Sequence, residues 1–170
     1  KYTLEKISYL KKEDCRIIES VLNGWFQNPK TLNLVSPSLT YPFKFKEWVS
    51  RNYYEIAEPI ISVVIKNKSW IIGHISYRIK EKEIRLFNLI IDEKFRRRGL
   101  AKLLIGKVEK DCCFKQKDYI TLTVLKKNKE AIMLYKKLGY SILCNKKSKK
   151  IKMKKKLAKI NYSFNGFTNN

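Results

Sequence analysis

Residues 89–102 of this 170-residue chain read LIIDEKFRRRGLAK, an apolar run that passes through a tight basic turn into the start of a helix. At such a turn, free backbone N–H groups and the positive end of the helix dipole together form a site for a pyrophosphate. Gly99 has no Cβ and lets a ligand approach the backbone, while Ala101 keeps the first helical turn small. An ordinary helix start with a solvated basic rim is the alternative. The interpretation that we prefer is a phosphate-binding loop, to which Arg97, Arg98 and Lys102 add positive charge.

The rest of the chain supplies the elements around this loop. Upstream, β-branched and alternating segments predict four strands, at residues 2–9, 59–66, 69–80 and 84–92. Apolar residues at helical spacing predict helices at 11–26 and 43–54, separated by a long loop with three prolines. Downstream, Asn128 caps a helix that Gly139 closes. The same patterns predict a further helix at 98–111 and strands at 119–125, 140–144 and 150–154.

These elements predict an α/β fold of the α+β type. We expect a mixed, mostly antiparallel twisted sheet of about seven strands with four flanking helices. Strands 84–92 and 119–125 are joined by a helix, which is the crossover that a parallel pair needs. We therefore expect these two strands to be parallel neighbours. One domain covers residues 1–157, and the polar residues 158–170 suggest a poorly ordered tail.

The composition excludes some classes of protein and leaves others open. The longest apolar runs are far short of the ~20 residues that cross a bilayer, so we expect a soluble, cytoplasmic protein without a membrane partner. The four cysteines form no Cys-x-x-Cys pair, which argues against a metal site. The net charge of +23 attracts anions, but only seven of the 38 basic residues are Arg, the usual phosphate- and base-reading residue. A nucleic-acid or ribosomal partner stays open without being indicated.

The chain contains two motifs, Arg96-x-x-Gly99-x-Ala101 and Asn128-x-x-Ala131-x-x-x-Tyr135-x-x-x-Gly139-Tyr140. The first resembles the first signature of the GNAT superfamily of N-acetyltransferases, and the second resembles the superfamily's second block. The two blocks are joined by a helix and a strand, in the order that the superfamily shows. The resemblance covers about residues 1–157.

The resemblance implies a reaction and a site. The expected reaction transfers an acetyl group from acetyl-CoA, without a metal, to a primary amine of a protein N-terminus or a small molecule. The backbone of Leu89, Ile90 and Ile91 is expected to hold the pantetheine arm, and Asn128 to contact it. Tyr135 is expected to be the general acid that protonates the departing thiolate, whereas helical spacing alone suggests a core aromatic. The loop expected to cradle the pyrophosphate comprises Arg96, Arg97, Arg98, Gly99, Leu100, Ala101 and Lys102.

Leu86-Phe87-Asn88 and Arg98-Gly99-Leu100 are similar to the ribosomal-protein alanine N-acetyltransferases. That group carries a catalytic Glu five residues before Asn128, where this chain has Thr123. The base therefore has several candidates: His74, the carboxylates Glu81, Glu83 and Glu93, and a water chain. A monomer or a homodimer fits equally. The alternative function is a non-catalytic GNAT-like module that binds RNA or a protein partner.

Overall fold

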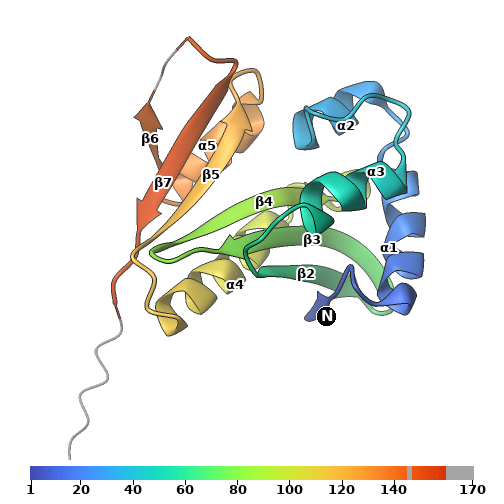
Figure 1. Ribbon diagram of the computed structural model, residues 1–170, viewed down its shortest axis with the longest axis horizontal. Coiled ribbons are helices and arrows are strands. Elements are labelled where there is room, and N and C mark those ends of the chain that lie inside the picture. The colour runs from blue at the N-terminus through green and yellow to red at the C-terminus, as the bar shows by residue number, and fades with distance from the viewer. Residues whose placement is uncertain (145–146, 160–170) are drawn as a thin grey trace, which may run out of the picture.

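The computed structural model describes residues 1–144 and 147–159 and contains a single twisted sheet with helices on both faces (Figure 1). In the described residues the sheet has seven strands in the order β1-β2-β3-β4-β5-β7-β6. They are β1 Tyr2–Ile7, β2 Ile60–Asn67, β3 Trp70–Ile79, β4 Glu83–Ile91, β5 Tyr119–Leu125, β6 Ser141–Cys144 and β7 Lys150–Lys156. The α-helices are α1 Lys12–Trp25, α2 Pro29–Val35, α3 Phe45–Val49, α4 Leu100–Phe114 and α5 Lys129–Lys137.

The β4–β5 pair is the parallel pair that the sequence predicts. The other described strand pairs are antiparallel, which confirms the mixed sheet. The parallel ladder is short, because it joins only residues 83–85 of β4 to residues 119–121 of β5. Beyond Arg85 the two strands separate, and the sheet opens between them (Figure 1). This opening positions the site described below.

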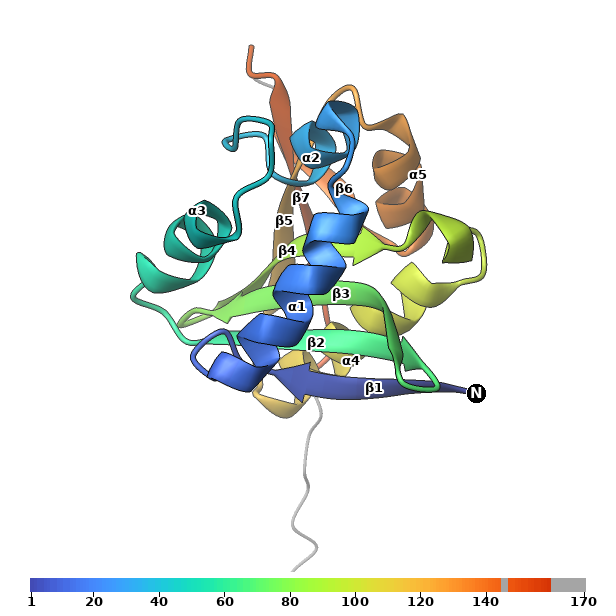
Figure 2. The same ribbon diagram turned by 90° about the vertical axis from the view of Figure 1, so that its right-hand side faces the viewer.

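The sheet is covered on both faces by apolar side chains. On one face, α4 and α5 pack on the inward residues of β3, β4, β5 and β7, among them Ile84, Leu122 and Met153. On the other face, α1 crosses β2 and β3 (Figure 2) and buries Ile18 and Leu22 together with Trp48 of α3. None of the described helices has both the length and the apolar character that a bilayer crossing requires.

Residues 1–144 and 147–159 contain five α-helices, one more than the four expected. The additional helix α2 lies in the segment predicted to be a loop, because Asn28 caps it by accepting from the Lys30 N–H (2.8 Å) and Pro29 occupies its first turn. The helix predicted at 43–54 is α3 followed by the π-helical turn Ser50–Tyr54. The helix predicted from residue 98 begins at Leu100, since Gly99 is left-handed (φ 77°). The predicted tail lies outside the described residues from 160 onward.

Candidate active site

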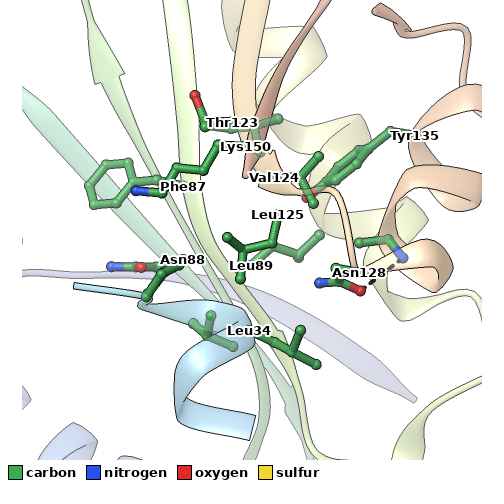
Figure 3. Close-up of a pocket in the computed structure, with 14 residues that line it drawn as sticks. Leu34, Phe87, Asn88, Leu89, Thr123, Val124, Leu125, Asn128, Tyr135 and Lys150 are labelled. Atoms are coloured by element: carbon green, nitrogen blue, oxygen red, sulfur yellow. Dashed lines mark hydrogen bonds between the residues drawn. The ribbon is translucent and has the colours of Figure 1, made fainter. Parts of the chain in front are cut away.

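The opening between β4 and β5 contains a cavity of about 200 Å³ (Figure 3). β4 supplies residues 86–89 to its wall, and the diverging end of β5 supplies residues 123–125. α5 closes one side with Asn128, Ala131 and Tyr135, and Leu34 and Val35 of α2 close another. The cavity therefore exists because the parallel ladder stops at Arg85 and two helices far apart in sequence cover the gap.

A β-bulge shapes the β4 wall of this cavity. The β3–β4 register shifts so that Asn88 and Leu89 together oppose Ile75, and Asn88 is left-handed (φ 51°). Asn tolerates this conformation better than most residues. Its side chain donates to Asn52 Oδ1 (3.2 Å) and to the Tyr53 hydroxyl (3.3 Å). A bulge interrupts the hydrogen-bond ladder locally and bends the strand. The backbone beside Leu89 therefore changes direction where the cavity begins.

His74 fixes the bulge from behind and does not reach the cavity. The side chain is fully buried, its Nδ1 donates to the Asn88 carbonyl (2.8 Å), and its Nε2 accepts from the Tyr9 hydroxyl (2.9 Å). Burial lowers the pKa of His74 to about 4, which keeps the ring neutral at physiological pH. These contacts assign His74 to support of the bulge. Glu81, Glu83 and Glu93 are also absent from the cavity wall.

A second cavity, of about 450 Å³, continues from the opening to the start of α4. Leu89, Asn128 and Ala131 line both cavities. At the far end, Gly99 precedes α4 without a side-chain cap, so the first N–H groups of the helix lack such a partner. A Cβ built on Gly99 would meet no atom within 4 Å, which means that the backbone there faces open space. Uncapped N–H groups at a helix start are an anion site.

Ten of the eleven residues predicted to hold the coenzyme line this second cavity. They are Leu89, Ile90, Ile91, Arg96, Arg97, Gly99, Leu100, Ala101, Lys102 and Asn128. Arg98 does not line it, because its guanidinium donates to the Lys94 carbonyl (3.4 Å) and lies 5.1 Å from the Phe95 ring centroid. The Arg97 guanidinium forms an ion pair with the Glu130 carboxylate (3.9 Å) at the rim of this cavity. In the described part of the chain no group of three or more metal-ligating side chains occurs.

Tyr135 lies where the two strands part. Its ring packs edge-on against Tyr140, with centroids 5.8 Å apart, and its hydroxyl points into the first cavity toward Val124 (Figure 3). Burial raises the pKa of Tyr135, so the phenol stays protonated at neutral pH and is available as a donor. Asn128 caps α5 by accepting from the Ala131 N–H (3.3 Å), as predicted, and faces the same space.

The geometry thus combines an opened parallel pair, an uncapped helix start and a buried phenol. The family model of the acetyltransferase (GNAT) family matches residues 28–140. This chain belongs to the GNAT family. Comparison with curated protein sequences finds no match.

Solved GNAT structures share the whole fold at low identity. The ribosomal-protein-S18-alanine N-acetyltransferase of Escherichia coli is 15% identical, with a TM-score of 0.67 and 96% of this chain and 98% of that chain covered. The PaiA N-acetyltransferase of Thermoplasma acidophilum, solved with coenzyme A, is 17% identical (TM-score 0.69; 92% and 99% covered). The spermidine N-acetyltransferase of Vibrio cholerae, solved with CoA and spermine, is 16% identical (TM-score 0.66; 91% and 95% covered). At these identities the likeness concerns the fold.

Some residues of this GNAT site were not predicted from the sequence. Leu34 and Val35 reach the cavity from α2, a helix that was missed. The Asn28-Pro29 pair could have revealed it, because Asn at the N-cap followed by Pro is a helix-start pattern. Asn88 was noted only as part of the resemblance to the ribosomal-protein alanine N-acetyltransferases. The sequence around it does not by itself indicate a left-handed backbone. Tyr9 and Tyr53 join the site through contacts that only the folded chain makes.

Proposed function

We propose that this GNAT protein transfers the acetyl group of acetyl-CoA to the primary amine of an acceptor. Family membership supports acetyl transfer in general. The observation that carries the finer proposal is the pair of adjoining cavities, which share the bulged backbone at Leu89 and together extend from the uncapped start of α4 to the Tyr135 hydroxyl. Such a space suits a long ligand with an anionic end and a reactive end.

The residues present fit acetyl-CoA. The backbone N–H groups at the start of α4, with Arg96, Arg97 and Lys102 beside them, suit the pyrophosphate. Leu89, Ile90 and Ile91 line the middle of the path with β4 backbone, and Asn128 lies opposite. Tyr135 holds its proton in the first cavity, where a leaving thiolate would need a donor. Catalysis then rests on the positioning of thioester and amine and on this proton.

Removal of the acceptor's proton has no obvious protein base. The wall of the first cavity contains no carboxylate and no imidazole in the described residues. It contains one cation, Lys150, whose side chain reaches across the opening toward Phe87 (Figure 3). A nearby positive charge favours the neutral form of an amine. We therefore expect the acceptor to lose its proton to water before it attacks.

The test is a thiol-release assay with acetyl-CoA and a panel of amines: peptides with free N-termini, amino acids and polyamines. The proposal expects acceptor-dependent release and a mass increase of one acetyl group on the acceptor. Acetyl-CoA binding without transfer to any amine would favour the alternative, a GNAT-like module that binds RNA or a protein partner. Absence of acetyl-CoA binding as well would overturn the proposed function.

A further inference from the structure

Two arginines lie directly opposite each other beside the cavity. Arg78 of β3 pairs with Arg85 of β4 in the antiparallel ladder, so both side chains lie on the same face of the sheet. Arg85 also donates to the hydroxyl of Thr123, the β5 residue that lines the cavity. The Arg78 guanidinium lies 5.2 Å from the centroid of Phe87, which is another cavity residue. The pair therefore borders the space in which the acceptor amine would lie.

The positive charge of this pair is incompletely compensated. Like charges directly opposite in a ladder are destabilising, and none of the salt bridges between described residues includes Arg78 or Arg85. The Arg78 Nε is buried and has no hydrogen-bond partner in the described structure, which is costly for a polar group. The pKa of Arg85 is lowered, first by burial and then by Arg78.

Glu83 offsets only part of the charge on Arg85, because other groups share its carboxylate. Glu83 lies on β4, accepts from the Thr121 hydroxyl (3.2 Å) and lies 3.7 Å from Lys80. On the same face, β7 adds Lys152 opposite Thr123 and Lys154 opposite Thr121. The acceptor side of the opening therefore combines half-buried guanidinium groups with further cations at its edge.

We propose that Arg78 and Arg85 bind a carboxylate of the acceptor, so that the acceptor is an α-amine with an acidic group nearby. The fork geometry of a guanidinium matches a carboxylate, and an anion between the arginines would relieve their repulsion. This inference rests on the proposed function for its amine. The same charges disfavour polyamines, which carry several cations. The carboxylate has two sources, an acidic side chain near a peptide N-terminus or the α-carboxylate of a free amino acid.

The experiment compares acceptors that differ in one carboxylate. The peptide arm uses two amidated peptides that are identical except for Glu or Gln at the second position, and the amino-acid arm uses alanine against alaninamide. Thiol release gives kcat/KM, and calorimetry gives the affinity of each acceptor for the protein. The variants are Arg85→Gln and Arg78→Lys, and Arg16→Gln on the exposed face of α1 is the matched control. Arg85→Gln removes one of two opposed charges, so it should keep the fold, which circular dichroism checks.

In either the peptide pair or the amino-acid pair, we expect the acceptor with the carboxylate to have a kcat/KM about tenfold higher than its neutral partner. A charge-assisted hydrogen bond contributes a free energy that corresponds to about this factor. Most of the difference should appear in KM. Arg85→Gln should remove the preference, because the charged acceptor then loses the contact that distinguishes it from the neutral one. Arg78→Lys should reduce the preference, and Arg16→Gln should retain it. Equal use of charged and neutral acceptors, or a preference that survives Arg85→Gln, would overturn the proposal. If no amine is acetylated, the proposed function fails, while the calorimetric preference still decides the arginine site.

Discussion

At the scale of single residues, Tyr135 carries the chemistry of the account. Tyr135→Phe is expected to lower kcat by about 10²–10⁴, the usual worth of a general acid, and to leave acetyl-CoA affinity unchanged. In the proposed mechanism the phenol gives its proton only as the C–S bond breaks, so the loss would appear in the transition state. Phe keeps the ring that packs on Tyr140, so the melting temperature should change little. If the folded Tyr135→Phe protein keeps wild-type turnover, Tyr135 is not the general acid and serves only in core packing.

His74 gives a second residue-scale prediction. It is the single histidine of the chain, so its imidazole signal in NMR needs no assignment. The folded pKa of about 4 lies below the unfolded value of about 6.5, because burial disfavours the cation. Between these two pKa values the unfolded chain therefore binds more protons than the folded chain. The contribution of His74 to the free energy of unfolding is fully present above about pH 6.5 and falls by about 3 kcal/mol as the pH drops toward 4.

The measurement for His74 is the imidazole chemical shift between pH 8 and pH 5, which should stay constant in the folded protein. A midpoint near 6.5 would show a solvated ring and would contradict the buried contacts to Tyr9 and Asn88. His74→Gln should make the acid dependence of the unfolding free energy shallower, because one titrating group is removed.

Site residues could be predicted from the sequence where they belong to a short local motif. Tyr135, Asn128 and the loop around Gly99 belong to compact motifs, and the structure places them along the two cavities. The Arg78–Arg85 pair could not be predicted, because it depends on the β3–β4 register, and a slip of one residue would place the side chains on opposite faces.

At the scale of elements, the described strands and the long periodic helices were predicted, whereas the short helix α2 was not. β5 has the predicted bounds, and α1 agrees to within one residue at each end, because both repeat their apolar pattern over several turns or alternations. α2 has only seven residues, which is too few for a periodic signal, and Pro29 was taken as a loop residue. The bulge at Asn88 follows from side-chain contacts across the fold and could not be predicted from β4 alone.

α4 offers an element-scale test of helix stability beside the site. Gly106 lies in its interior, and a Cβ there would meet nothing within 4 Å. Gly106→Ala is expected to stabilise the fold by about 0.4–1 kcal/mol, since it removes backbone freedom from the unfolded chain and improves helix propensity. For a chain of this size that corresponds to roughly 1–4 °C in melting temperature. An unchanged or lower melting temperature would mean that α4 is not regular at this point.

At the scale of the whole molecule, the net charge of +23 and the shape of the sheet act together. Cations surround both ends of the site, at the start of α4 and on the outer face of β7. A basic protein draws in anionic ligands, and the two cavities lie along the gap where β4 and β5 separate. We therefore predict that an anionic coenzyme stabilises the entire fold.

The most direct test is the melting temperature in increasing acetyl-CoA for wild type, Gly99→Asn and Gly106→Ala. A ligand of the native state adds about 2.7 kcal/mol at a hundredfold excess over Kd, roughly 5–10 °C for a chain of this size. Asn tolerates the left-handed backbone of residue 99, but its side chain would occupy the open space there. The melting temperature should rise for wild type and Gly106→Ala, and this rise should be lost in Gly99→Asn. No rise in wild type, or an equal rise in Gly99→Asn, would contradict the proposed coenzyme site.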